Sequence, residues 1–547
     1  MDSEHLIGQK LLLAFDGKEL TPEIRETIKA YKPAGLTFFR SLNIDNPTQV
    51  RRLTVSLQRL ARELDLPPFL IAADQEGGQL MAIGEGTTPL PGNMALGATG
   101  STKLARRAGE VLGRELAAMG VNVNYAPNCD VNINPMNPVI GIRSFGEDPA
   151  AVAQLASAMI EGIQSQGVAA TAKHFPGHGD TAGDSHHGLP SVPHTLERLQ
   201  QVEFPPFQAA IVADTKLMMT AHLALPALDG PDAPPATLSR RILHGLLREE
   251  LGFKGVIVTD AMDMGAIRQG DALGEDGARA AAAGADLLLL TSNPDDQRRV
   301  YENLLSALQH GDLDAKSISA SVDRILSLKR WLADHPQPEL SIIGCTAHQA
   351  VADEIAERSI TLVRDDAKLL PLKLDTAQRI AVVVPRPVDL TPADTSSYVT
   401  PGLGVAIRQF HSNVDEYLIP YSPDAEEIAT LLERLRGYDM LILGTLNAYA
   451  SPNQAKFVRR VLKLDIPSVV VALRLPYDLA AFPEVKTYLC TYSILEPSMQ
   501  APAKALFGQI EFEGKLPVSI PGLYSLGHGK TFETGAGQGL RKKREER

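Results

Sequence analysis

Short apolar runs alternate with longer amphipathic stretches through the first 335 residues. The runs are rich in Leu or β-branched residues and bounded by loops, which is typical of strands buried on both faces. They lie at Lys10–Phe15, Gly35–Phe39, Phe69–Asp74, Asn122–Ala126, Val168–Lys173, Leu217–Ala221, Gly255–Asp260 and Ala285–Thr291. Helical patterns between them include Pro47–Leu64, Thr102–Ala118, Ala150–Gln166 and Ser239–Glu250. Because right-handed helical crossovers join parallel strands, this alternation predicts a closed (β/α)8 barrel, with an open doubly wound sheet as the alternative.

The alternation breaks at Asp334-His335-Pro336-Gln337-Pro338, a sequence typical of a linker. Five further runs follow at Arg379–Val384, Asp415–Ile419, Met440–Gly444, Ser468–Leu473 and Thr487–Thr491. We therefore predict an α/β protein in which a TIM-type (β/α)8 barrel is followed by a smaller α/β sandwich domain. The expected divisions are a catalytic barrel at 1–335, a linker at 336–356, the sandwich at 357–535 and a basic tail at 536–547. The segment Glu357–Leu372 is expected to open the second domain.

Composition narrows the classes of partner. The net charge of −12 over 547 residues argues against nucleic acid, which requires clustered Lys and Arg. No stretch of 18 apolar residues and no basic leader region is present, so neither a membrane span nor a secretory signal is expected. The three cysteines match no disulfide or metal spacing. We expect a cytoplasmic protein, a monomer or homodimer, that needs no cofactor or metal and acts on a small molecule.

Polar residues gather where the predicted barrel strands stop, the position at which barrel enzymes place their chemistry. Examples are Asp74, Asn128, Asp130, Lys173, His174, His222 and Asp260. The fifth strand leads into KHFPGHGDTAGDSHHGLP at Lys173–Pro190, where Gly and Pro prevent a continuous helix. A loop so rich in ionisable groups has no explanation in core packing, and it predicts a functional loop.

Within this loop, a carboxylate at Asp184 can hold one tautomer of His186 and leave the other ring nitrogen free to exchange a proton. Asp260 ends an apolar strand, where it is either a nucleophile or a helix cap. Asp74, followed by two glycines, suits hydrogen bonding to sugar hydroxyls or a simple turn. Arg143 either grips a substrate group or pairs with a neighbouring acid, Glu147 or Asp148.

Five motifs together resemble the glycoside hydrolases of family 3, and more narrowly their bacterial β-N-acetylglucosaminidase branch. They are DQEGG at Asp74–Gly78, PLPGNMALGA at Pro89–Ala98, GIRSFGEDP at Gly141–Pro149, the KHFPGHGDT…DSHHGLP loop and VTDAM at Val258–Met262. SITLVRDDAKLLPL at Ser359–Leu372 resembles the opening of the family's C-terminal domain. One departure is Gln79, which stands where the family usually has a basic residue.

The resemblance implies that Asp260 is the nucleophile and that His186, partnered by Asp184, is the general acid/base. It also implies that four residues hold the terminal sugar, namely Asp74, Arg143, Lys173 and His174. In this branch the acid/base comes from the barrel loop, whereas many β-glucosidases of the family take a Glu from the second domain.

The expected activity is therefore that of a retaining exo-β-N-acetylglucosaminidase with a covalent glycosyl-Asp intermediate. With 1 Trp and 5% aromatic residues, the chain favours a short pocket over a long polysaccharide groove. Muropeptides are the first substrate choice and chitooligosaccharides the second. Alternatives are a β-glucosidase, β-xylosidase or glycosyl phosphorylase of the same family. More distant alternatives are a metal-dependent barrel hydrolase, given the four His and two Asp of the loop, and a non-catalytic sugar-binding protein.

Overall fold

The computed structural model of the protein describes residues 2–531, so the predicted basic tail at 536–547 lies outside the described residues. All eight strands predicted for the first domain are confirmed, with bounds β1 Leu11–Leu13, β2 Gly35–Phe38, β3 Leu70–Ala73, β6 Val123–Asn124, β7 Ala169–Phe175, β8 Leu217–Thr220, β9 Val256–Thr259 and β10 Leu288–Leu290. They pair in parallel in the order β10-β1-β2-β3-β6-β7-β8-β9. A bridge between Val258 and Leu287 brings β9 next to β10, which completes the barrel.

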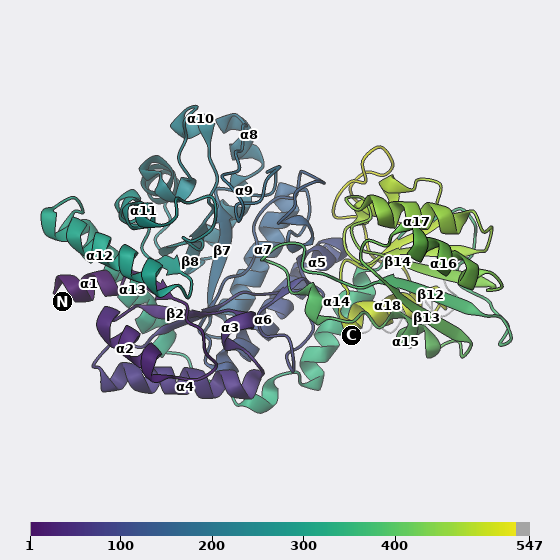
Figure 1. The fold of residues 1–547 in the computed structure, drawn as a ribbon, viewed down its shortest axis with the longest axis horizontal. Coiled ribbons are helices and arrows are strands. Elements are labelled where there is room, and N and C mark those ends of the chain that lie inside the picture. The colour runs from purple at the N-terminus through teal and green to yellow at the C-terminus, as the bar shows by residue number, and fades with distance from the viewer. Residues whose placement is uncertain (1, 532–547) are drawn as a thin grey trace.

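Helices surround this barrel on its outside (Figure 1). They are α1 Ser3–Gly8, α2 Pro22–Tyr31, α3 Arg40–Asn43, α4 Pro47–Glu63, α5 Asn93–Thr99, α6 Thr102–Met119, α7 Pro149–Gln164, α8 Leu196–Gln201, α9 Phe204–Val212, α10 Pro226–Asp229, η3 Arg241–Glu250, α11 Asp271–Ala283, α12 Pro294–His310 and α13 Ala315–Ala333. Helix α4 shows why such segments form. The Asn46 side chain caps its first turn, Pro47 occupies the position where no amide donor is needed, and Leu53, Leu57 and Leu60 bury one face.

Two irregular segments interrupt the regular alternation at the carboxyl ends of the strands. The short hairpin of β4 (Gln75–Gly77) and β5 (Leu80–Met81) follows β3. Residues 125–148, between β6 and α7, contain only the short helix η1 (Gly141–Arg143). Both segments carry residues of the motifs identified in the sequence, and both lie at the barrel face where we expect the site.

The second domain is built on a six-stranded sheet in the order β11-β16-β15-β14-β12-β13. Five of its strands were predicted and are confirmed as β12 Ile380–Pro385, β13 Val414–Ile419, β14 Met440–Thr445, β15 Ser468–Ala472 and β16 Thr487–Cys490. The sixth, β11 (Thr361–Asp365), lies in the opening segment Glu357–Leu372 and pairs antiparallel with β16. Helices α15 Leu403–Arg408, α16 Ala425–Leu435, α17 Pro452–Leu462 and α18 Glu496–Leu506 complete this domain.

The segment expected as a linker, 336–356, holds regular structure. Helix η4 (Leu340–Ile342) is followed by α14 (Thr346–Ser359), which packs against α5, α6 and α18. Val351, Ala352 and Ile355 are buried at helical spacing along α14. A short apolar stripe flanked by charged residues carries a weak helical signal by itself, and its burial depends on both domains.

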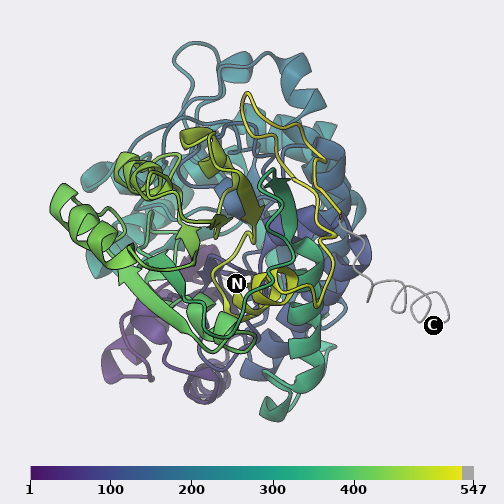
Figure 2. The ribbon, with the colours of Figure 1, turned by 90° about the vertical axis from the view of Figure 1, so that its right-hand side faces the viewer.

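The two domains lie side by side, with α5, α14 and α18 between them (Figure 1), and the second sheet stands in front of the barrel in the view of Figure 2. Polar contacts cross the boundary, including an ion pair between Arg107 and Glu354 and a 2.9 Å hydrogen bond from Asn132 to the Tyr477 hydroxyl. Among residues 2–531, no helix combines the length and the apolar character that crossing a membrane requires.

Candidate active site

A cavity of about 560 Å³ opens at the carboxyl ends of the barrel strands. Six of the seven site residues predicted from the sequence line it, and these are Asp74, Arg143, Lys173, His174, His186 and Asp260. The seventh, Asp184, contacts His186 from behind. Part of the lining comes from the second domain, from residues between 389 and 398. The residues that the sequence singled out separately are therefore brought to one hollow.

Two carboxylates and two cations form a connected network of ion pairs on the barrel side of the cavity. Lys173 Nζ lies 2.6 Å from Asp74 Oδ1 and 2.7 Å from Glu76 Oε1. Arg143 donates from Nη2 and Nε to the two oxygens of Glu76, at 2.8 and 3.0 Å. The charges of this quartet cancel, and its geometry holds each member in one orientation.

The quartet shows that Arg143 does not pair with Glu147 or Asp148, the neighbouring acids expected as one alternative. Its guanidinium is bidentate to Glu76, and Nη1 donates to the carbonyl of Val139 at 3.1 Å. Glu147 instead accepts hydrogen bonds from Ser519, and Asp148 caps α7. Arg143 thus borders the cavity as a fixed positive group whose partner is Glu76.

Burial and charge pull the pKa values of the two acids apart. Burial acts to raise the pKa of Glu76, but Arg143 and Lys173 outweigh it and lower that pKa to about 2. Burial raises the pKa of Asp74 above its ordinary value, and the charge of Lys173 only partly opposes this. The negative charge of Asp74 is therefore stabilised less than that of Glu76. Because Asp74 also lines the cavity, it is the carboxyl better placed to accept hydrogen bonds from a ligand.

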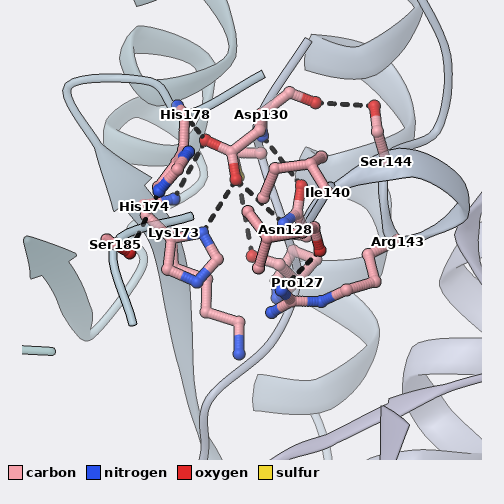
Figure 3. A network of polar contacts seen from close by, with 12 residues as sticks. Pro127, Asn128, Asp130, Ile140, Arg143, Ser144, Lys173, His174, His178 and Ser185 are labelled. Carbon is pink, nitrogen blue, oxygen red and sulfur yellow. Dashed lines mark hydrogen bonds and ion pairs between the residues drawn. The ribbon is translucent and has the colours of Figure 1, made fainter. Parts of the chain in front are cut away.

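Asp130 is the centre of a second network, shown in Figure 3. Its carboxylate accepts from the backbone N–H of His178 at 2.7 Å and lies 2.8 Å from His174 Nδ1. The amide of Asn128 donates to the same carboxylate at 2.9 Å. These bonds fix the end of β7 and the start of the histidine loop, so Asp130 is a positioning residue.

The network also sets the state of His174. Burial, together with the charges of Arg143 and Lys173, holds the pKa of His174 well below its ordinary value, so the ring is neutral. With Nδ1–H donating to Asp130, Nε2 carries the lone pair. His174 can accordingly accept a hydrogen bond from a ligand hydroxyl in the cavity that it lines.

The predicted Asp184–His186 pair is present. The Nδ1–H of His186 donates to Asp184 Oδ1 at 2.6 Å, and the backbone N–H of His186 donates to the same oxygen at 2.9 Å. Asp184 is held ionised, because its bonds to His186 outweigh the effect of burial and lower its pKa. His178 steadies the turn through hydrogen bonds to Thr181 and Ser185. The Nε2 atom of His186 is left as the nitrogen available to a ligand.

Asp260 directly follows β9 and lines the same cavity. Burial acts to raise its pKa, but neighbouring imidazoles and the N–H of Ala261, which donates to Oδ1 at 2.8 Å, lower it below its ordinary value. The imidazoles are those of His174, His222 and His186. His222 Nε2 donates to the carbonyl of Ala261 at 2.9 Å and so fixes the turn that bears Asp260. An ionised carboxylate at the wall of a barrel cavity is suited to nucleophilic attack.

The histidine loop and the segment after β9 are bonded together. The N–H of Gly265 donates to the carbonyl of His186 at 3.2 Å, and that of Ala266 donates to the carbonyl of Ser185 at 3.1 Å. Asp260 and His186 thus face one hollow from two contacting segments, an arrangement that can carry attack and proton transfer across a single bond.

In one group of described residues, three possible metal-ligand atoms all lie within 4.8 Å of one another. It consists of Asp180, His194 and Glu203. Arg198 donates to both carboxylate oxygens of Glu203 at 2.7 and 2.9 Å and lies 3.7 Å from Asp180. A guanidinium in that position supplies the positive charge that a cation would bring, so the donor set does not fit a metal.

Sequence reasoning did not assign roles to two acids that organise the site. Glu76 lies inside the DQEGG motif, and Asp130 lies among the polar strand-end residues, so both carried a positional signal. The sequence gives no such signal for residues 389–398, because nothing local along the chain links that segment to the barrel.

Comparison with known proteins identifies a family model and several similar sequences and structures. Residues 6–328 match the family model described as the glycosyl hydrolase family 3 N terminal domain. Beta-hexosaminidase A of Pseudoalteromonas piscicida is 31% identical, over 95% of this chain and 97% of its own length. A beta-N-acetylglucosaminidase/beta-glucosidase of Cellulomonas fimi is 30% identical, over 82% of this chain and 83% of its own. The solved family 3 β-N-acetylglucosaminidase from Paenibacillus sp. str. FPU-7 is 38% identical with a TM-score of 0.90, covering 95% of this chain and 99% of that one.

Proposed function

The chain belongs to glycoside hydrolase family 3, and from this premise we propose that it is a retaining exo-β-N-acetylglucosaminidase. The observation that carries the proposal is that His186, held by Asp184, and Asp260 line one sugar-sized cavity. The β-hexosaminidase and β-N-acetylglucosaminidase names of the similar proteins support the same activity.

In the proposed first step, His186 carries a proton on both ring nitrogens. Asp260 bonds to the anomeric carbon as the bond from that carbon to the leaving oxygen breaks, and Nε2 of His186 gives its proton to that oxygen. In the second step, Nε2 of the now neutral His186 takes a proton from water while the water oxygen bonds to the anomeric carbon. The bond from that carbon to Asp260 breaks, which releases the sugar and restores both residues. Because the pKa of Asp260 is lowered, the attacking carboxylate is ionised. Its negative charge stabilises the oxocarbenium-like transition state. Asp184 keeps the Nδ1 proton of His186 in place, so that only Nε2 takes part.

We propose that the terminal sugar is held by Asp74, Lys173, Arg143 and His174. Asp74 and Lys173 lie 2.6 Å apart, so they offer an acceptor and donors to neighbouring hydroxyls. His174 offers the Nε2 acceptor, and Arg143 presents its guanidinium beside Val139. Their mutual hydrogen bonds fix them before substrate binds, which lowers the cost of ordering the site.

We further propose that the protein acts in a reducing cytoplasm, as a monomer or homodimer. Support for the reducing compartment comes from Cys129, Cys345 and Cys490, which are free thiols. We propose muropeptides from cell-wall recycling as the first substrate group and chitooligosaccharides as the second.

The test is an assay of the purified protein on p-nitrophenyl β-GlcNAc, β-glucoside and β-xyloside, each with and without inorganic phosphate. We expect the β-GlcNAc substrate to have the highest kcat/KM, and proton NMR to show the β-anomer of GlcNAc as the first product. Preference for the glucoside, or sugar 1-phosphate as the main product when phosphate is added, would overturn the proposal.

A further inference from the structure

The loop that bears the Asp184–His186 dyad is closed at its base by a contact between two other side chains. Asp180 precedes the dyad in the sequence and His194 follows it, and the Nε2–H of His194 donates to Asp180 Oδ2 at 2.8 Å. This bond joins residues 14 positions apart, so it ties the two ends of the loop together. We name residues 180–194 the dyad loop and the Asp180–His194 hydrogen bond its clasp.

The clasp is fastened to helices α8 and α9, which lie above β7 in the view of Figure 1. Arg198, on α8, donates to both carboxylate oxygens of Glu203 at 2.9 and 2.7 Å. Its Nη2 lies 3.7 Å from the same Asp180 oxygen that accepts from His194. Arg198 therefore connects the base of the dyad loop to Glu203, which is buried and directly precedes α9.

Helix α9 provides a firm support for this connection. Phe204 and Phe207, in α9, pack on Phe175 at the end of β7, with ring centroids 6.4 and 5.4 Å apart, and all three rings are buried. The start of the histidine loop also lies against Glu203, since a Cβ on Gly177 would come within 2.8 Å of the Glu203 Cβ. The clasp thus holds the dyad loop to a part of the fold that is packed on the barrel core.

The remainder of the dyad loop has little packing to hold it. Of residues 182–189, only Ser185 is buried. The far end of the loop is held by backbone hydrogen bonds, from the Ala224 N–H to the Pro190 carbonyl at 2.8 Å and from the Val192 N–H to the Ala224 carbonyl at 3.0 Å. The clasp, in contrast, is made by side chains, so a single substitution removes it. A loop with few buried contacts depends on such bonds for a fixed position.

We propose that Asp180 and His194 are positioning residues for the general acid/base, because their hydrogen bond holds the dyad loop where Nε2 of His186 reaches the leaving oxygen. Neither residue is among those that line the cavity, so both act through His186. Proton transfer requires heavy atoms about 2.6–3.2 Å apart, and a small displacement of His186 is therefore enough to slow it. This inference rests on the proposed function and adds two residues to it.

The first experiment separates proton transfer from the other parts of the reaction. For each variant, kcat/KM is measured on chitobiose, whose leaving oxygen needs a proton, and on dinitrophenyl β-GlcNAc, whose leaving group needs none. The ratio of the two values does not depend on the fraction of the protein that is folded. We expect His194→Ala to lower the ratio about 10-fold, since His186 is then less often in place. A ratio equal to that of the wild type overturns the proposal.

Two further variants test whether the clasp itself is responsible. His194→Gln places an amide N–H near the position of Nε2 and should keep the ratio within about 3-fold of wild type. The matched control is His244→Ala on η3, because His244 also has a carboxylate partner, Glu249 at 3.4 Å, but does not line the cavity. It should keep the wild-type ratio. A ratio in His194→Gln or His244→Ala as low as in His194→Ala contradicts the assignment. Should His194→Ala yield no folded protein, His194→Asn, whose shorter side chain cannot reach Asp180, replaces it.

The second experiment asks whether His194 acts through His186. Once the imidazole of His186 is removed, its position no longer matters. The double variant His186→Ala/His194→Ala should therefore lie within about 2-fold of His186→Ala on chitobiose. A further loss of about 10-fold in the double variant would show an independent role and end the inference. Failure of the wild-type enzyme to hydrolyse dinitrophenyl β-GlcNAc would instead overturn the proposed function, so the two failures are distinguishable.

Discussion

The side-chain oxygen of Gln79, on the barrel, accepts a hydrogen bond from the guanidinium of Arg474 in the second domain. Arg474 is buried and also pairs with Asp394, at 3.0 Å. Gln79 stands where the resemblance leads us to expect a basic residue, and the guanidinium beside it comes from the other domain. Neither Gln79 nor Arg474 is among the residues that line the cavity, so their pairing acts on the contact between the domains and on the position of residues 389–398.

This pairing predicts coupled effects on stability. Arg474→Gln leaves the buried Asp394 without its cation and should lower the free energy of unfolding by about 3–5 kcal/mol. Gln79→Arg places two guanidiniums together and should cost about 1–3 kcal/mol. The double variant restores one guanidinium beside Asp394, so its loss should be smaller than the sum. A double-mutant cycle by urea unfolding measures the coupling, and strictly additive losses would contradict it.

The nucleophile assignment predicts that Asp260→Ala lowers kcat/KM on p-nitrophenyl β-GlcNAc by at least about 10⁴-fold, because the covalent route is lost. Azide is small enough to enter the space left by the carboxylate. We expect added azide to restore part of the rate and to yield the α-glycosyl azide, detected by NMR. Normal turnover in Asp260→Ala would remove the residue from this role.

The acid/base assignment predicts a dependence on the leaving group. His186→Ala should lose about 10²–10⁴-fold on chitobiose, whose leaving oxygen needs a proton. The loss should be much smaller on a dinitrophenyl glycoside, whose leaving group needs none. Leu189→Ala, at an exposed position of the same loop that is not among the residues lining the cavity, is the control and should lose less than about 10-fold on either substrate. Equal losses on the two substrates in His186→Ala would argue for a structural role.

The quartet around Glu76 predicts acid sensitivity. The pKa of Glu76 is lowered from 4.5 to about 2, so its stabilising contribution is complete above pH 4.5 and is lost as pH falls toward 2. The shift corresponds to about 3 kcal/mol. Urea unfolding of wild type and Glu76→Gln between pH 3 and 7 should show the variant less stable at pH 7, with the difference shrinking toward pH 3. Parallel pH profiles would contradict this account.

The parallel strands of the barrel, and the polar residues that end them, could be predicted because both depend on short-range order along the chain. Buried runs joined by helices pair in parallel, and their carboxyl ends then meet on one face. Asp74, Lys173 and Asp260 were therefore assigned to one site without any knowledge of contacts. The Asp184–His186 pair was also predictable, since its partners are two residues apart and glycine lies beside them.

The tertiary structure alone decided which charges neutralise one another and what covers the cavity. Arg143 meets Glu76 across 67 residues, and Gln79 meets Arg474 across 395. The antiparallel pairing of β11 with β16 likewise joins distant segments of the second domain, and the docking of α14 against α5, α6 and α18 depends on how the two domains pack. Local periodicity reports which face of an element is buried, but it contains no information on what buries that face. The sequence by itself therefore determined which residues gather at the barrel rim, and only the packing of the second domain decided what closes the cavity beyond them.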